Sequence, residues 1–191
     1  PISISAQMSV DEQATALPQG VIDAADAEYL LMSNVYDRTT PAVVNIEVQL
    51  TSSASVFDDV SRGSGFVYDM QGHVITNAHV IKDAAHIMVT FNDGYVAEAA
   101  LVGLDSYSDL GVIRVDVPLD RLSPLALADS DTVRVGQRAI AIGNPFGLSS
   151  SMSQGIVSGL GRTLRSAELI DMEAAPGFQN PAIIQTDTPI N

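Results

Sequence analysis

The chain has 191 residues, of which 46% are hydrophobic, none is cysteine, and 9 basic residues face 23 acidic ones, giving a formal net charge of −14. This acidity excludes nucleic acid and anionic membranes as main partners, because both are bound through clustered Lys and Arg. The lack of cysteine excludes disulfides, thiol catalysis and thiolate metal sites, and no apolar run approaches the roughly 18 residues of a membrane span.

The first 20 residues are small and polar without periodicity, and we interpret them as an arm. They lack the basic and apolar regions of a signal peptide. The segment 23–36 is different, because its apolar residues recur at helical spacing: Ala24, Ala27, Leu31 and Val35. This pattern predicts a short amphipathic helix, which Pro41 ends as it opens the first strand.

Short apolar runs bounded by turn residues come next and predict six strands, at 43–48, 63–68, 73–76, 86–91, 95–102 and 110–115. A polar loop, 51–62, separates the first two. The turn Asn92–Gly94 is a strong hairpin signal between the fourth and fifth. Short strands joined by tight turns predict a small closed barrel.

A proline-containing connector, 116–131, separates this barrel from a second series of strands, at 137–143, 149–161 and 182–186, with an irregular loop over 162–180. Three strands make half of a second six-stranded barrel, and an open half exposes an unpaired edge. We therefore expect three regions: an N-terminal arm and helix (1–40), a first barrel (41–118) and the first half of a second barrel (119–191). The missing strands are expected from outside these residues.

His79 and Asp109 are the candidate catalytic residues. His79 follows the apolar run 74–76, and Asp109 opens the sixth strand. An imidazole can exchange protons near neutral pH, and a carboxylate on a neighbouring strand could orient it, as base and orienter of a nucleophilic hydrolase. Taken alone, His79 is better interpreted as a capping or buried histidine, and Asp109 as a turn residue or cap at the start of a strand.

Other candidates are weaker. His73 and His86 are interpreted as surface strand residues, and three histidines without an acidic cluster do not predict a metal site. Gly63–Gly65 lacks the lysine of a phosphate loop and predicts close packing of strands. Ser149–Ser151 lies in a loop without the strand–turn–helix setting of a nucleophile, so we do not assign it that role.

Five motifs occur together in one order: Gly63–Phe66, Val74–Val80, Asp109–Val115, Ala141–Gly147 and Ile184–Asp187. In this arrangement the sequence resembles the HtrA (Deg) serine proteases. The resemblance implies an all-β, chymotrypsin-like fold of two perpendicular barrels with the active site between them. It implies His79 as general base and Asp109 as orienting carboxylate. It places the nucleophilic serine and oxyanion-hole amides just beyond Asn191, and no PDZ domain in this chain.

The resemblance implies further features. Residues 162–180 match a regulatory sensor loop, and 148–152 an adjacent activation loop. The family assembles as trimers through N-terminal segments, here residues 1–36, and uses no cofactor or metal. It acts on unfolded or damaged polypeptides outside the cytoplasm, in the bacterial periplasm or envelope or in equivalent organelle spaces.

Two functions therefore fit the sequence. One is a serine endopeptidase of the HtrA/Deg type, whose remaining C-terminal part supplies the nucleophile. The other is a catalytically inactive fragment that acts as a protein-binding or chaperone-like scaffold. Without the nucleophile, a triad enzyme loses on the order of 10⁶ in rate, so the 191 residues alone are expected to be inactive.

Overall fold

The computed structural model describes residues 17–50, 60–144, 150–165 and 179–190. For residues 163–165 and 179–182 it describes the backbone alone. Residues 1–16 of the expected arm and parts of the expected 51–62, 148–152 and 162–180 loops therefore lie outside the described residues, while the last two residues of the expected arm, Gln19 and Gly20, belong to a helix. The chain divides into two compact units, residues 1–35 and 36–191, which we describe separately.

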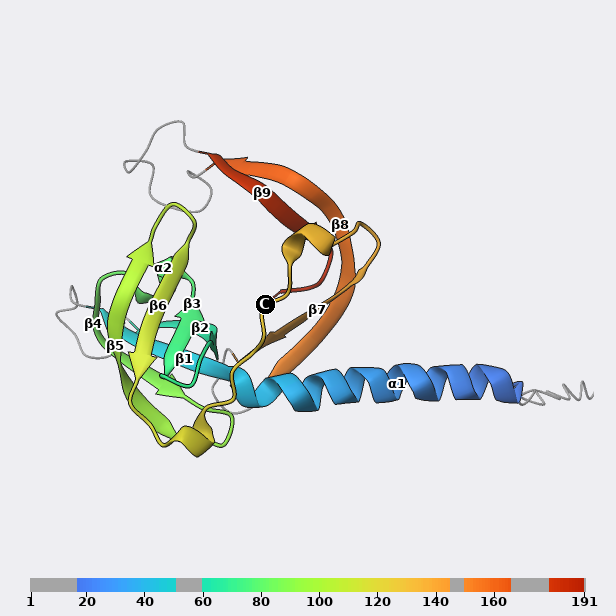
Figure 1. Ribbon diagram of the computed structural model, residues 1–191, viewed down its shortest axis with the longest axis horizontal. Helices are drawn as coiled ribbons and strands as arrows, with labels where there is room; N and C mark the ends of the chain where they lie inside the picture. Colours follow the sequence, from blue (N-terminus) through green and yellow to red (C-terminus); the bar gives the residue numbers. More distant parts are fainter. Residues whose placement is uncertain (1–16, 51–59, 145–149, 166–178, 191) are drawn as a thin grey trace, which may run out of the picture. The chain divides into compact units, whose positions relative to one another are not determined.

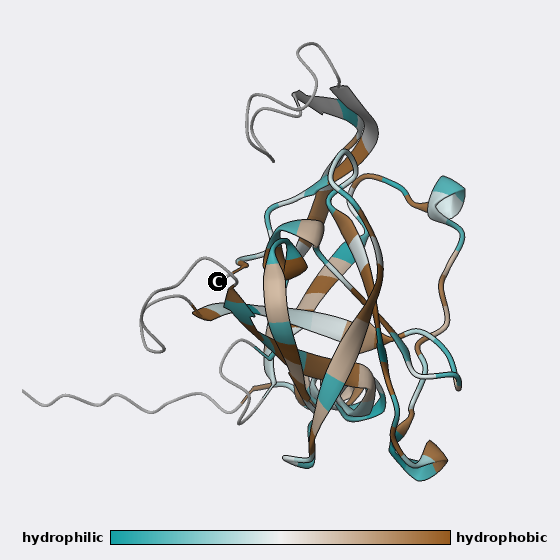
Figure 2. Ribbon diagram, turned by 90° about the vertical axis from the view of Figure 1, so that its left-hand side faces the viewer, coloured by the Kyte–Doolittle hydropathy of each residue, from teal (hydrophilic) through white to brown (hydrophobic). Residues whose placement is uncertain are grey.

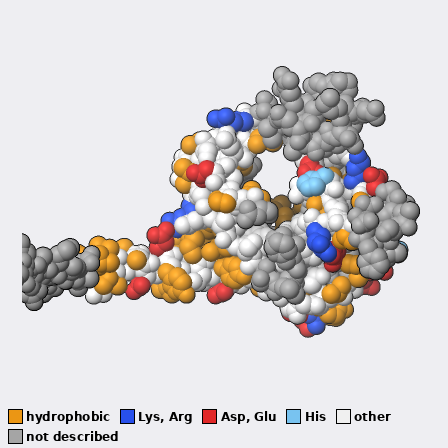
Figure 3. Space-filling model, turned by 180° about the vertical axis from the view of Figure 1, so that it is seen from behind, with side chains coloured by type: hydrophobic (Ala, Val, Ile, Leu, Met, Phe, Trp, Pro, Cys, Tyr) orange, Lys and Arg blue, Asp and Glu red, His pale blue; other side chains and the backbone are white. Residues whose placement is uncertain are grey.

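The first unit consists of most of helix α1, Gln19–Thr39, whose last residues belong to the second unit. The helix is longer at both ends than the predicted 23–36. The first turn of the helix forms although its residues lack strong helical periodicity, because two hydrogen bonds stabilise it. Val21 N–H donates to Pro18 O at 2.9 Å, and the Gln19 amide donates to the Asp23 carboxylate at 2.8 Å. No side chain of α1 is buried, and Figure 3 shows hydrophobic side chains along it. Within the described residues, none of the helices has the length and hydropathy needed to span a bilayer.

The predicted first barrel is confirmed as a closed barrel with strand order β1-β2-β3-β6-β5-β4 (Figure 1). A short 3₁₀ turn, Thr40–Ala42, contains Pro41 and separates α1 from the barrel. The strands are β1 (Val43–Leu50), β2 (Val60–Val67), β3 (His73–Thr76), β4 (Ala84–Thr90), β5 (Val96–Asp105) and β6 (Leu110–Val115). The apolar runs thus predicted β3 and β6 to the residue. In contrast, β1, β2, β4 and β5 each extend by two or three residues beyond one predicted end, where pairing with the neighbouring strand continues.

The barrel interior is filled largely by β-branched residues. Figure 2 shows hydrophobic and hydrophilic residues following one another along the ribbon. On β4, Ile87 and Val89 are buried while His86 and Met88 are exposed. The largest fully buried aliphatic side chains among the described residues are Val44, Ile46, Val48, Val67, Val74, Ile81, Val89, Ile113 and Val115. Their burial supplies the main stabilising free energy of the barrel.

The second half of the larger unit is an antiparallel sheet in the order β7-β8-β9, formed by Arg138–Gly143, Ser151–Arg165 and Gln179–Thr186. Strands β8 and β9 run further into the predicted 162–180 loop than the sequence indicated. The pairing of β8 with β9 contains three register shifts between Val157 and Leu164. These shifts let the hydrogen-bonded pairing of the two strands continue past glycines that interrupt the alternation of apolar and polar residues. The connector carries two short 3₁₀ turns, Leu119–Arg121 and Ser130–Thr132.

Two hydrogen bonds join the end of β7 to the barrel. The Asn45 amide of β1 donates to Asn144 O at 2.9 Å, and Asn144 N–H donates to the Ser64 hydroxyl of β2 at 2.9 Å. Asn45 is a buried polar residue within an apolar strand, and this bond accounts for its burial.

The interpretation of Gly63–Gly65 as close packing is confirmed. A Cβ at Gly63 would lie 2.6 Å from Cγ2 of Val80, and one at Gly65 would lie 2.7 Å from Ile75 O on β3. Real Cβ atoms essentially never approach so closely. Only a glycine therefore lets β2 lie this near to its neighbours.

We predict that Gly65→Ala lowers the free energy of unfolding by about 1–3 kcal/mol, because backbone and core atoms must shift to admit the methyl group. Gly103→Ala on β5 is the matched control, since a Cβ there meets nothing within 4 Å. Its stability should change by less than about 0.5 kcal/mol. Denaturant unfolding of both variants measures this, and equal effects would contradict the packing explanation.

Candidate active site

His79 lies in α2, Ala78–Ile81, a single helical turn that the sequence did not predict. We expected the histidine directly where the chain leaves β3. The turn forms because its other residues, Ala78, Val80 and Ile81, are buried against the barrel. Their burial leaves His79 on the outer side, with 61% of its side chain exposed.

Asp109 immediately precedes β6 and has a left-handed backbone with φ of 55°. Aspartate is one of the few residues that tolerate this conformation. Its side chain is only 9% exposed. Because β3 and β6 pair antiparallel, with Thr76 opposite Gly111, the end of one strand lies beside the start of the other. This pairing brings together two residues that are 30 positions apart in the chain.

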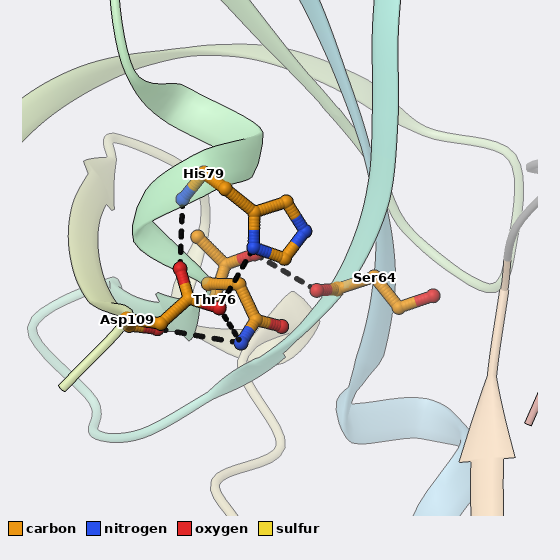
Figure 4. Close-up of polar contacts among 5 residues, drawn as sticks. Ser64, Thr76, His79 and Asp109 are labelled. Atoms are coloured by element: carbon orange, nitrogen blue, oxygen red, sulfur yellow. Dashed lines mark hydrogen bonds and ion pairs between the residues drawn. The ribbon is translucent and has the colours of Figure 1, made fainter. Parts of the chain in front are cut away.

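The two side chains that the sequence singled out meet in the structure (Figure 4). His79 Nδ1 lies 2.7 Å from Asp109 Oδ2, and the His79 backbone N–H donates to Asp109 Oδ1 at 2.9 Å. The Ala78 N–H donates to the Asp109 carbonyl at 3.1 Å. Sequence reasoning predicted neither of these backbone contacts, and it also missed the Asn77 amide, which donates to Asp109 Oδ2 at 3.0 Å.

This geometry has a direct chemical consequence. When the carboxylate accepts Nδ1–H, the neutral imidazole carries its lone pair on Nε2. In Figure 4 the Nε2 edge of the ring points away from Asp109. The pair can therefore take a proton from a hydroxyl placed beside Nε2 and hold the resulting imidazolium next to a buried anion.

The sequence from residue 63 to residue 191 matches the family model of the trypsin-like peptidase domain. The chain belongs to this family of trypsin-like peptidases. The curated relatives that it matches include proteases of the HtrA/Deg type. Protease Do-like 1, chloroplastic, of Arabidopsis thaliana is 36% identical over 99% of this chain and 43% of its own length. The periplasmic pH-dependent serine endoprotease DegQ of Escherichia coli K12 is 35% identical over 100% of this chain and 44% of its own length.

A solved structure supports the same assignment. A variant of the HtrA-type protease AlgW, determined with a tripeptide, is 34% identical with a TM-score of 0.67, over 83% of this chain and 46% of that chain. The expected chymotrypsin-like fold is thereby confirmed, with one closed barrel, a partial second sheet and an N-terminal helix. The chain spans less than half the length of these curated HtrA/Deg relatives.

The remaining sequence candidates lie outside this site. His86, on β4, pairs with Glu98 at 3.2 Å, and both side chains are exposed. Ser149 lies outside the described residues, while Ser150 is buried with no hydrogen-bond partner for its hydroxyl. In the described part of the chain, no three His, Asp or Glu side chains are grouped to hold a metal ion.

His73 forms a second histidine–aspartate pair, in the turn between β2 and β3. Its Nδ1 lies 2.7 Å from Asp69 Oδ2, and Asp69 Oδ1 accepts backbone N–H groups of Gln71 at 2.9 Å and His73 at 3.2 Å. The His73 side-chain bond, followed by these backbone bonds, lowers the pKa of Asp69 below its ordinary value of 3.8. The Asp69–His73 pair therefore belongs to the turn between β2 and β3 and is not part of the His79 site.

We predict that Asp69→Asn destabilises the protein in a pH-dependent way. Because the pKa of Asp69 is lower in the folded than in the unfolded chain, its contribution is complete above the unfolded value of about 3.9 and is lost as the pH falls through the folded pKa. The melting temperature of the variant should therefore fall below wild type at pH 6, and the difference should shrink towards pH 3. Asp116→Asn, at an exposed position after β6, is the control. A difference independent of pH would rule out the carboxylate as its cause.

Proposed function

We propose that this chain carries the base and orienter of an HtrA/Deg-type serine endopeptidase. His79 is the general base and Asp109 its orienting carboxylate. The observation that carries the proposal is the 2.7 Å contact between His79 Nδ1 and Asp109 Oδ2, with Nε2 left to accept a proton. The serine hydroxyl comes from the remaining C-terminal part of the protein.

In the proposed reaction, the serine O–H gives its proton to His79 Nε2 as the oxygen attacks the carbonyl carbon of the scissile peptide. Asp109 stabilises the imidazolium that forms, through the Nδ1–H hydrogen bond. The imidazolium then gives the proton from Nε2 to the leaving amine, which breaks the C–N bond and leaves an acyl-enzyme. Water repeats the sequence and releases the acid, with His79 again taking and returning one proton.

The substrates proposed are unfolded or damaged polypeptides, as part of protein quality control outside the cytoplasm. Relatives named as periplasmic and chloroplastic support an extracytoplasmic site, and we favour the bacterial periplasm or envelope. A protein-binding scaffold without activity is the alternative outcome of the test below.

We predict that the full-length protein digests casein and that His79→Ala abolishes this, because no other group then takes the hydroxyl proton. Asp109→Asn should lower kcat by about 10⁴-fold, since the carboxamide no longer enforces the required tautomer. His86→Ala, which removes an exposed histidine on β4, is the control and should retain activity. Casein cleavage by the purified His79→Ala variant would remove His79 from the mechanism. A folded but inactive wild type would favour the scaffold.

For the chain's organisation, we propose that residues 1–40 are an arm and helix, 41–118 a barrel domain and 119–191 the first half of a second barrel. We also propose that the N-terminal segment assembles the protein as a homotrimer. The support lies in α1 itself, whose large apolar side chains are exposed: Val21, Ile22, Tyr29, Leu30 and Leu31. Apolar surface of this kind is favourable to bury between subunits.

We predict that deleting residues 1–35 from the full-length protein converts trimers to monomers, measured by light scattering after gel filtration. The double substitution Leu30→Ser and Leu31→Ser should weaken assembly in the same direction. Leu119→Ser is the matched control, because Leu119 is 65% exposed and Leu30 is 64% exposed, yet Leu119 lies outside α1. Trimers that persist after the deletion would exclude α1 as the assembly element.

A further inference from the structure

The Asp109 carboxylate oxygen that faces His79 has two donors. Oδ2 lies 2.7 Å from the imidazole Nδ1 and accepts from the Asn77 amide at 3.0 Å. The same amide nitrogen also lies 3.3 Å from the Asp109 backbone carbonyl. Asn77 therefore contacts Asp109 at both its side chain and its backbone, from the residue that links β3 to α2.

Asn77 does not make the hydrogen bond that its position before α2 would predict. Asn77 is the N-cap of α2, where an asparagine side-chain oxygen ordinarily accepts an N–H from the first helical turn. No such capping bond forms. Instead, the N–H of His79 is accepted by Asp109 Oδ1. The carboxylate has taken over the capping role, and the asparagine acts as a donor.

The two bonds together fix the orientation of the carboxylate. The terminal torsion of aspartate is broad and has no sharp staggered minima, so one hydrogen bond leaves the group free to swing. Here the His79 backbone N–H holds Oδ1, while the Asn77 amide holds Oδ2 beside the imidazole. Both donors belong to the same short segment, so the carboxylate is held relative to the ring that it orients.

We propose that Asn77 is a positioning residue of this peptidase, acting through Asp109 to keep the His79 imidazole in the tautomer with its proton on Nδ1. This inference rests on the proposed function and extends it to a residue that does not touch the substrate. Without the amide donor, the carboxylate swings and exchanges its bond to Nδ1 for bonds to water. The proton then distributes between the two ring nitrogens.

The test compares Asn77→Ala and Asn77→Asp in the full-length protein, with Thr76→Val as the matched control. Asn77→Asp keeps the shape but replaces the donor by a like charge beside Asp109. Thr76→Val removes the neighbouring bond from the Thr76 hydroxyl to Ser64 O, 2.9 Å long, which does not involve Asp109 (Figure 4). We expect kcat to fall about 10–100-fold in both Asn77 variants, by analogy with other partners that orient a histidine, with KM within about twofold. Thr76→Val should retain kcat.

A second readout separates positioning from stability. Residues 1–191 contain 3 histidines, and ¹⁵N-histidine labelling together with the His79→Ala spectrum identifies the ring nitrogens of His79. Wild type and Thr76→Val should show Nδ1 protonated and Nε2 free, whereas both Asn77 variants should show a mixture. An unchanged tautomer and kcat within twofold in Asn77→Ala would overturn the proposal. A fall in kcat equal to that of Thr76→Val, with the tautomer unchanged, would equally overturn it, since that effect is general destabilisation.

The design keeps this inference distinct from the proposed function. If the wild-type protein is folded but inactive, the peptidase assignment fails while the tautomer comparison still decides the role of Asn77. If Asn77→Asp does not fold, Asn77→Ala introduces no new charge and gives the answer. A third outcome is that the wild type is active, His79→Ala is inactive, and Asn77→Ala keeps the wild-type kcat and tautomer. That outcome refutes the positioning role of Asn77 and leaves the peptidase assignment intact.

Discussion

The buried carboxylate of Asp109 is the constraint around which the candidate site is built. A charge removed from water must be matched by donors, and here the donors are a backbone N–H, an imidazole and a side-chain amide from Asn77–His79. One set of hydrogen bonds therefore both satisfies the Asp109 carboxylate and orients the His79 imidazole. The hydrogen bonds that make Asp109 tolerable in its buried position are the same ones that leave Nε2 of His79 available.

The barrel makes this arrangement possible because it fixes the positions of the segments that carry His79 and Asp109. Pairing of β3 with β6 sets the distance between Asn77 and Asp109. Two glycines then let the helical turn of α2 lie directly on the barrel, because a Cβ at Gly63 would collide with Val80 and one at Gly111 would lie 2.5 Å from Cδ1 of Ile81. The histidine is thus carried by a rigid scaffold, which suits a group that must hold its orientation through a reaction.

The barrel could be predicted because its strands are marked locally. Apolar runs alternate with turn residues, as at Asn92–Gly94, and the pattern gave β3 and β6 their observed limits. The helical turn at His79 was missed because four residues show no helical period and propensity carries no signal at that length. The extensions of β8 and β9 were missed because bulged pairing is decided by the partner strand and not by the residues' own pattern.

By itself, the sequence determined the all-β class, the first barrel, the close packing of Gly63 and Gly65, and the choice of His79 and Asp109 as the pair to examine. These follow from local periodicity, from residue size and from which side chains can exchange protons. Only the tertiary structure decided that Asp109 takes a left-handed backbone, caps α2 in place of Asn77 and receives the Asn77 amide. Those features depend on contacts across 30 or more residues, and a pattern read along one segment does not contain them.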